Sequence, residues 1–339
     1  MLSKFRISLG RINYKMYFAL LVLGLCPTIY TTVRVFFLGQ LPGEWSFSIA
    51  GQLSWVNLIY EILNEAIILP LFYFVGKVKN DEDEFSIRVR TGMLISFVVY
   101  TLLSMFILIF AEQLLKLMAA DASIIDASTD YIRIESVANV FGILMKYVLV
   151  VLVTVNKSKY LYIFSGVHLL LCLLSDTFLV SNLHVSAKLG VNGIGYSNII
   201  VNALLFVVSI MLLEKEGIKI FVKEKLNFVW LKEFAKISSI SGMESLVRNI
   251  AYMVMIARMV NIVSEQGTYW VANNFIWGWL LLHLWEMIFS VICTRRRFCT
   301  TICCRGIGIL CIPRTGTMGF SCSAIGRFLH IMCWRLLIS

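Results

Sequence analysis

The stretch that decides the fold is residues 91–111, which read TGMLISFVVYTLLSMFILIFA. It contains no charged side chain. An α-helix rises 1.5 Å per residue, so about 20 such residues cross the ~30 Å hydrocarbon layer of a bilayer. The run is continuously apolar and does not alternate, which favours a helix over a strand of an outer-membrane barrel. These residues therefore predict a transmembrane helix.

The whole chain shares this character. Its 339 residues are 59% hydrophobic and 15% charged, with a mean hydropathy of +0.83, whereas a soluble domain is about 45–50% apolar and about 25% charged. The run from Met16 extends to about Leu38 without a small-residue cleavage site, which favours a first membrane helix over a cleaved export signal. Beside 91–111, we expect spans at 16–38, 47–75, 131–155, 159–181, 193–213, 236–263 and 269–292.

The basic residues are distributed unevenly over the loops. The net charge of +10 could indicate nucleic-acid binding, but the basic residues flank apolar runs and form no stripe. Sixteen Lys and Arg lie in the N-terminus and the second, fourth and sixth loops, against only Lys116 and Lys188 in the alternate loops. Because Lys and Arg are retained in cytoplasmic loops, this bias predicts a multi-pass protein of the cytoplasmic membrane with its N-terminus inside and no nucleic-acid partner.

The chain is predicted to have four parts. Residues 1–213 form a six-helix block, and 236–292 hold two further helices. Between them, 214–235 mixes lysines with large apolar residues, which favours a basic amphipathic helix at the inner headgroups over a solvated linker. An Arg near one helix end and an Ala-x-amide-x-x-Trp start recur at Arg34 and Ala50 and at Arg258 and Ala272, which suggests a repeat.

The fourth part, 293–339, differs from the rest. It holds seven of the nine cysteines and seven arginines but no lysine and no acid. The paired C-x-x-C spacing of structural zinc sites is absent, so no metal site is predicted. A disulfide framework does not fit a cytoplasmic tail either. We interpret this tail as the product of a shift in reading frame between about His283 and Cys293.

Two motifs carry a resemblance to a known family. Residues 67–76 read IILPLFYFVG at the end of the second span, and 189–198 read LGVNGIGYSN at the start of the sixth. With these motifs the chain resembles the multidrug and toxic compound extrusion (MATE) family from about residue 15 to about residue 285. The resemblance implies an all-α integral membrane protein on a plan of twelve helices in two lobes. One six-helix lobe and the first two helices of the second would be present.

Ionisable residues within spans are costly in lipid and therefore mark candidate sites. Glu61, Asn64 and Glu65 have the spacing of one helix face. The two carboxylates could bind a coupling cation or pair with Arg34 or another cation across the bundle. Asp176 in the fifth span could likewise bind a cation or hydrogen-bond a neighbouring helix.

The seventh span adds Glu244. Its i, i+4 spacing to Arg248 favours an internal ion pair, whereas the resemblance implies a cation-coupling role, because family members have an acidic residue in this span. The cation-coupling candidates are therefore Glu61, Glu65, Asp176 and Glu244. The amides and aromatics could line a substrate cavity or join helices; these candidates are Asn64, Tyr60, Asn198, Asn202, Asn273, Asn274 and Trp277. His168 is interpreted as a core histidine, and Glu135 as interfacial.

No G-x-x-x-x-G-K-S/T loop and no catalytic triad or metalloprotease pattern occurs, so we expect neither an enzyme nor a cofactor. The energy for transport would then come from an ion gradient. The leading hypothesis is a secondary antiporter that exports amphipathic or cationic organic compounds in exchange for Na⁺ or H⁺, with the lipid bilayer and a small organic substrate as partners. The alternatives are a lipid-linked sugar flippase, which the intramembrane acids disfavour, and a non-functional truncated product. The oligomeric state is not predicted.

Overall fold

The computed structural model describes residues 14–41, 45–218, 220 and 226–280. These belong to two compact units, one formed by residues 33–272 and the other by residues 1–32 with 273–339. Each unit is described by itself. The tail from residue 293 lies outside the described residues, so its interpretation as a frame-shift product stays a prediction.

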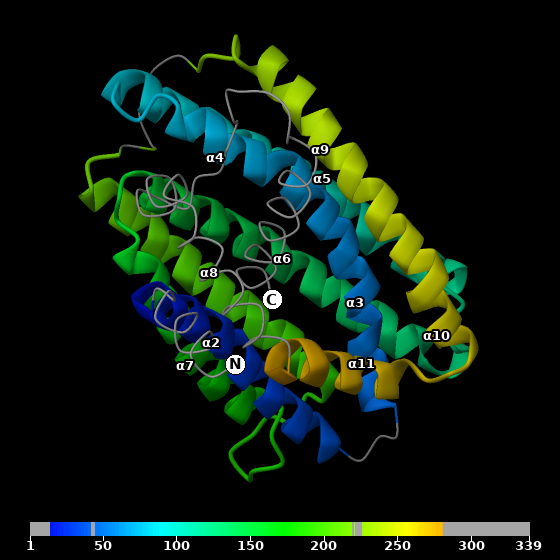
Figure 1. The fold of residues 1–339 in the computed structure, drawn as a ribbon. Coiled ribbons are helices and arrows are strands. Elements are labelled where there is room, and N and C mark those ends of the chain that lie inside the picture. The colour runs from blue at the N-terminus through cyan, green and yellow to red at the C-terminus, as the bar shows by residue number, and fades with distance from the viewer. Residues whose placement is uncertain (1–13, 42–44, 219, 221–225, 281–339) are drawn as a thin grey trace, which may run out of the picture. The chain divides into compact units, whose positions relative to one another are not determined.

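Every regular element in the described part of the chain is helical (Figure 1). The long helices are α2 (Tyr14–Gly39), α3 (Ser46–Leu63), α5 (Glu82–Leu117), α6 (Ile125–Thr154), α7 (Lys159–Leu179), α8 (Val191–Lys215) and α9 (Leu231–Tyr252). Shorter elements are α4 (Leu69–Gly76), a 3₁₀ turn (Ala122–Ile124), α10 (Arg258–Ile262), α11 (Gln266–Phe275) and π-helical turns at Asn64–Ile68, Met253–Ala257 and Ile276–Leu280.

All eight predicted spans fall on these helices, and the last continues beyond the described residues. Within the described residues, five helical segments are long and apolar enough to cross a membrane: Ser46–Lys77, Glu82–Leu117, Ala122–Thr154, Lys159–Leu179 and Val191–Lys215. The predicted class, an all-α multi-pass membrane protein, is confirmed. The predicted orientation and the division into four parts stay predictions.

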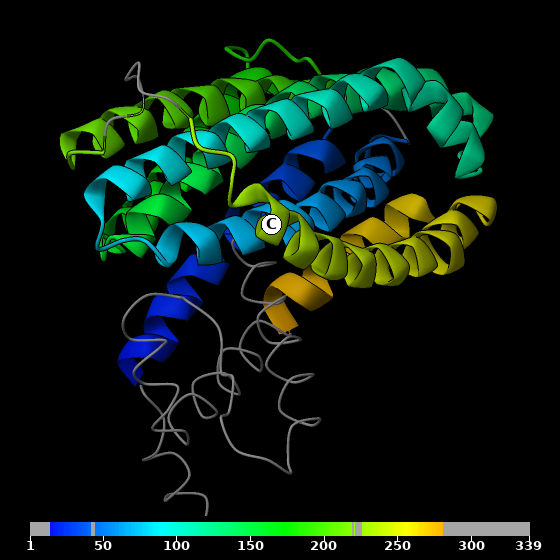
Figure 2. The ribbon, with the colours of Figure 1, turned by 90° about the horizontal axis from the view of Figure 1, so that it is seen from above.

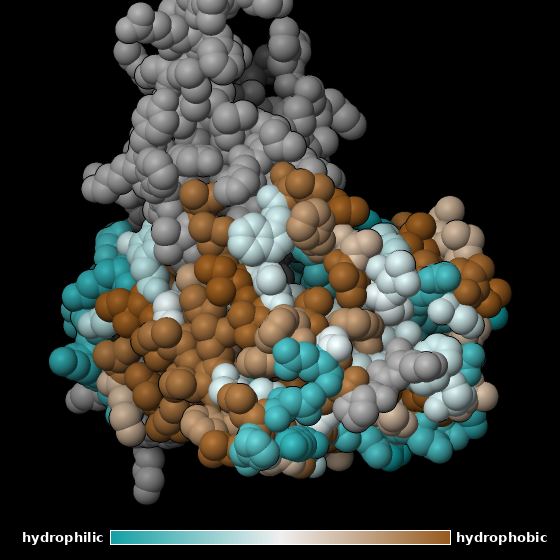
Figure 3. All heavy atoms as spheres, turned by 90° about the horizontal axis from the view of Figure 1, so that it is seen from below, coloured by the Kyte–Doolittle hydropathy of each residue, from teal (hydrophilic) through white to brown (hydrophobic). Residues whose placement is uncertain are grey.

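The helices place their apolar residues outside and many polar ones inside, the reverse of a soluble bundle. On α5, Ser96, Tyr100 and Ser104 are buried, whereas Leu102 and Ile109 are more than half exposed. Figure 3 shows hydrophobic side chains over a broad area of one face of the molecule. Such a surface fits a lipid environment, because exposing a large apolar area to water would cost free energy.

In the unit of residues 33–272, α6 packs most extensively, lying between α5 and α8, while α7 covers α8 (Figure 1). The helix α9 runs alongside α3 and α4 and contacts the π-helical turn between them (Figure 2). The second span therefore meets both later helices of the six-helix block and the seventh span.

The π-helical turn at Asn64–Ile68 interrupts the second span just before Pro70. Proline has no N–H to donate, and its ring clashes with the carbonyl four residues earlier, so the preceding turn widens. The N–H of Leu69 accordingly donates to the carbonyl of Asn64, five residues back. Asn64 and Glu65 are both buried in this turn.

The start of α8 explains the second family motif physically. Gly190 has a φ of +63°, which L side chains rarely adopt, and it directly precedes the helix. A Cβ on Gly193 would lie 2.9 Å from the carbonyl oxygen of Leu179 at the end of α7. The two glycines therefore allow the tight turn and the close approach of α7 and α8.

The end of α8 is a Schellman motif around Gly217, whose φ is +87°. The N–H of Ile218 donates to the carbonyl of Leu213, and that of Gly217 to Glu214. Beyond it, the described residues before Trp230 are not helical. Gly217 therefore ends α8, residues 231–235 already belong to α9 (Leu231–Tyr252), and the expected amphipathic linker over 214–235 stays a prediction.

The first residue after α8 also connects it to α7. The Nζ of Lys157 lies 2.5 Å from the Oε2 of Glu216, and the hydroxyl of Tyr160 donates to the Oε1 of Glu216 at 2.8 Å. These two hydrogen bonds, first that of Lys157, lower the pKa of Glu216, and the carboxylate in turn raises the pKa of Lys157.

We expect Gly193→Ala to lower the melting temperature of the detergent-purified protein. The new methyl group meets a backbone oxygen that cannot rotate away, and overpacking of this kind costs about 1–3 kcal/mol. Gly166→Ala on α7 is the control, because nothing lies within 4 Å of its Cβ position. The melting temperatures of the two variants and the wild type are measured by heating the protein and quantifying the folded fraction by size-exclusion chromatography. A Gly193→Ala variant that melts at the same temperature as the wild type would contradict the close packing.

We expect Glu216→Gln to lower the melting temperature at pH 7 but not in acid. A carboxyl with a lowered folded-state pKa stabilises the fold above its unfolded pKa, and this contribution is lost as the pH falls through the folded value. The difference in melting temperature between the wild type and the variant should therefore become smaller as the pH falls below about 4. A difference that is the same at every pH would show that the ion pair is not its cause.

Candidate functional site

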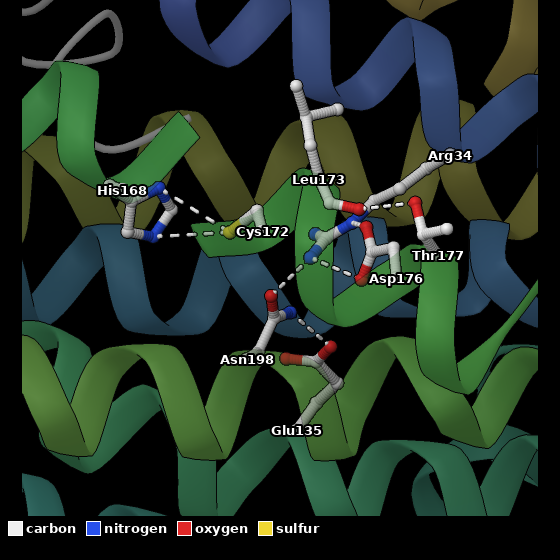
Figure 4. A network of polar contacts seen from close by, with 8 residues as sticks. All are labelled: Arg34, Glu135, His168, Cys172, Leu173, Asp176, Thr177 and Asn198. Atoms are coloured by element: carbon white, nitrogen blue, oxygen red, sulfur yellow. Dashed lines mark hydrogen bonds and ion pairs between the residues drawn. The ribbon is translucent and has the colours of Figure 1, made fainter. Parts of the chain in front are cut away.

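A deeply buried ion pair links the first and fifth spans in the described part of the chain. Arg34 lies near the end of α2, within the unit of residues 33–272, and its Nε donates to the Oδ2 of Asp176 on α7 at 2.6 Å. Its Nη2 approaches the other carboxylate oxygen at 3.4 Å. The side chains of Arg34 and Asp176 are 11% and 1% exposed. The guanidinium therefore holds both oxygens away from lipid and water (Figure 4).

A second carboxylate joins this pair through an amide. The Nη2 of Arg34 donates to the Oδ1 of Asn198 on α8 at 2.6 Å, and the Nδ2 of Asn198 donates to the Oε1 of Glu135 on α6 at 2.6 Å. Glu135 is 3% exposed. We call Arg34, Glu135, Asp176 and Asn198 the buried charge cluster; it joins α2, α6, α7 and α8 (Figure 4).

Two further ionisable side chains follow on the same face of α7. His168, Cys172 and Asp176 are spaced four residues apart, and the Sγ of Cys172 lies 3.6 Å from the Nδ1 of His168. His168 also hydrogen-bonds with Asn202 of α8. A polar row thus continues from the charge cluster along α7. In the described residues, no three His, Cys, Asp or Glu side chains gather as a metal site would require.

The charge cluster is electrostatically asymmetric. When both carboxyl groups are ionised, one guanidinium faces two negative charges. An uncompensated charge is costly where water is excluded, so such a group favours the uptake of one more positive charge. The amide of Asn198 accepts a hydrogen bond from Arg34 and donates one to Glu135. It can therefore keep a hydrogen bond to either neighbour when the charge of the cluster changes. The arrangement is suited to binding a proton or a small monovalent cation.

The second span makes a separate set of contacts. Glu65 accepts from the Nη2 of Arg248 on α9 at 2.5 Å, whereas Asn64 accepts from the hydroxyl of Tyr100 on α5 at 2.7 Å. The adjacent residues Asn64 and Glu65 therefore hydrogen-bond to two different helices, α5 and α9. Of the alternatives open for Glu65, a cation across the bundle is the one found, and that cation is Arg248, whereas Arg34 binds Asp176.

The other predicted site residues are dispersed. Tyr60 hydrogen-bonds the Oγ of Ser104 at 2.8 Å, and Asn202 donates to the carbonyl of Ala138 at 3.3 Å, so both join helices. Glu61 is partly exposed and Glu244 is exposed. The remaining candidates, Asn273, Asn274 and Trp277, belong to the other unit, in which Thr28 donates to the carbonyl of Gly278.

The burial of Glu135 and its contact with Asn198 do not follow from the sequence pattern. Glu135 is expected near the interface because it lies close to the predicted start of the fourth span at residue 131, but the helix begins at Ile125, six residues before that start, and Glu135 is buried. A sequence signal existed: Tyr131, Glu135 and Ala138 are spaced as one helix face, and all three are buried. Only the packing of α8 against this face identifies Asn198 as the partner.

We expect Arg34→Gln to destabilise the protein strongly. Removing one partner of a buried ion pair costs about 3–5 kcal/mol, because the other charge stays buried. Adding Asp176→Asn should recover part of the loss, since it removes that charge. The measurement is the thermal melting of both single variants and the double variant.

The matched control for Arg34→Gln is Arg133→Gln. Arg133 lies 4.0 Å from Asp130 with both side chains exposed, and exposed pairs contribute about 0–1 kcal/mol. Additive losses in the double variant, or a loss for Arg133→Gln as large as that for Arg34→Gln, would contradict the pairing.

The comparisons with known proteins agree with this architecture. Residues 78–179, which run from just before α5 to the end of α7, match the model of the MatE family. No curated protein sequence matches the chain. The matched segment contains Glu135 and Asp176 but neither Arg34 nor Asn198.

Two solved MATE structures share the fold. One, a MATE protein in complex with MaD3S, is 13% identical with a TM-score of 0.63 over 85% of this chain and 65% of its own length. The other, a mutant of the Vibrio cholerae MATE transporter VcmN, is 14% identical with a TM-score of 0.62 over 87% and 67%. The chain thus spans about two thirds of their length. The family match and the shared fold together confirm the resemblance to the MATE family that the sequence predicted.

Proposed function

We propose that this chain acts in a secondary active transporter that exports amphipathic or cationic organic compounds across the cytoplasmic membrane by antiport with Na⁺ or H⁺. The single observation that carries the proposal is the buried charge cluster, in which Arg34 faces Asp176 and Glu135. The MATE-type fold supports transport as the general activity.

The mechanism follows from the charge balance. A proton or Na⁺ that enters the cluster neutralises the second carboxylate and weakens the competition between Asp176 and Glu135 for Arg34. The hydrogen bonds of Asn198, which join α2 to α8 and α6, then rearrange. Because these contacts join four helices, the bound and empty cluster would favour different packings of the lobe, and the ion gradient would bias the two states.

The other cation-coupling candidates have weaker support. Glu65 already binds Arg248. Glu61 and Glu244 are more exposed than Asp176, so less of their charge needs compensation by a bound ion. Asp176 and Glu135 are therefore the preferred candidates for ion coupling. Glu61, Glu65 and Glu244 remain weaker candidates.

The test is transport into or out of liposomes that contain the purified chain. With a Na⁺ or proton gradient imposed, we expect ethidium to move against its own gradient, and the gradient that works identifies the coupling ion. Asp176→Asn and Glu135→Gln should each lower this rate at least about tenfold, the effect of losing one charge-assisted interaction.

The control for the transport assay is Glu112→Gln. Glu112 forms an exposed pair with Lys116 on the same helix at 2.6 Å and lies outside the cluster. Its loss should leave the rate unchanged. Gradient-driven transport at the wild-type rate by Asp176→Asn and by Glu135→Gln would exclude the cluster as the coupling site, and no transport by the wild type under either gradient would exclude antiport by this chain.

A further inference from the structure

A further buried carboxylate in the unit of residues 33–272, in addition to Asp176 and Glu135, is also in contact with a cation. Glu65 lies in the π-helical turn of the second span, and the Nη2 of Arg248 on α9 lies 2.5 Å from its Oε1. The hydroxyl of Ser241 donates to the backbone carbonyl of Glu65 at 2.8 Å, and Ser245 hydrogen-bonds its side chain. The carboxylate and the backbone carbonyl of Glu65 thus both accept hydrogen bonds from side chains of α9.

The two partners differ in how firmly they are held. The side chain of Glu65 is 10% exposed, against 35% for Arg248. The backbone at Glu65 is fixed by the wide turn before Pro70 and by the close approach of Gly242, whose Cβ position lies 2.8 Å from the Cβ of Ala66. Arg248 reaches the site by a long flexible stem with four rotatable bonds. The acid is therefore the fixed part of the pair and the guanidinium the movable one.

We propose that Glu65 binds the charged group of the transported compound, and that the Arg248 guanidinium is the resident cation which the compound displaces. This inference rests on the proposed function and names the substrate class. Since a guanidinium donates N–H groups to the carboxylate, the group that replaces it must be a compact planar cation with N–H donors. Guanidinium and amidinium compounds fit this description, whereas a cation without N–H groups, such as tetraphenylphosphonium, does not.

The exchange also explains how specificity arises. A tethered guanidinium competes at high effective concentration, so a compound binds only if its own charge and hydrogen bonds match those of Arg248. A neutral compound would leave Glu65 buried without a counter-charge. The nearby carboxylate of Glu61, close enough to interact with Glu65, adds to the preference for a cation, and the outward movement of Arg248 keeps the total charge of the site constant.

The test measures how tightly two organic cations bind to the purified full chain in lipid nanodiscs. The amidinium probe is DAPI, followed by its fluorescence, and the comparison cation is tetraphenylphosphonium, followed by its radiolabel. We expect Arg248→Gln to bind DAPI about tenfold more tightly than the wild type and Glu65→Gln about tenfold more weakly, the size of one charge-assisted interaction. Tetraphenylphosphonium affinity should change much less in both.

Two further variants serve as controls for the DAPI-binding measurement. The double variant Glu65→Gln with Arg248→Gln leaves no uncompensated charge from this pair and should fold as well as the wild type, yet bind DAPI as weakly as Glu65→Gln. Arg133→Gln is the control, because Arg133 forms an exposed pair with Asp130 at 4.0 Å within α6, and the DAPI affinity of this variant should equal that of the wild type.

The outcomes separate this inference from the proposed function. DAPI affinity that is unchanged in Arg248→Gln and in the double variant, with antiport intact, overturns the exchange site alone. The expected pattern of affinities without gradient-driven transport supports the site and contradicts antiport. A wild type that binds no DAPI overturns the exchange site directly.

Discussion

The structure depends on one constraint: the hydrocarbon layer offers no hydrogen-bond partner to a polar group. Backbone N–H and C=O groups must then be satisfied within each segment, which is why the apolar runs form helices. The same constraint turns the helices so that Ser96 and Ser104 of α5 face inward and Leu102 faces outward. Any charge inside the bundle has to find its counter-charge there, and this determines where the sites lie.

Two buried ion pairs satisfy that requirement in different ways. Arg34 and Asp176 are both deeply buried and are joined by Asn198 to a further carboxylate, so the pair is part of a network that holds α2 against α7 and α8. Glu65 and Arg248 join the second span to the seventh, with only the acid well buried. The first is the network that we propose to respond to a small ion, and the second is the pair that we propose to exchange one organic cation for another.

Departures from regular α-helix occur where function is proposed. In the π-helical turn before Pro70, the adjacent residues Asn64 and Glu65 contact two different helices, α5 and α9. Such turns lose hydrogen bonds in the regular register and persist where the surrounding packing stabilises them. Gly190 and Gly193 are the corresponding feature of α8, where they permit its close approach to α7.

The sequence alone determined the class of protein and the positions of its helices, because a run of about 20 apolar residues has no stable alternative in lipid. It also identified Asp176, Glu65 and Asn198 as candidates, since polar groups at this depth are costly. Only the tertiary structure decided the pairings. The partner of an ionised residue lies on another helix, 142 residues away for Arg34 and Asp176, and its identity depends on helix rotation and approach. For the same reason Glu135 could be recognised as part of the charge cluster only after α8 was seen to pack against it.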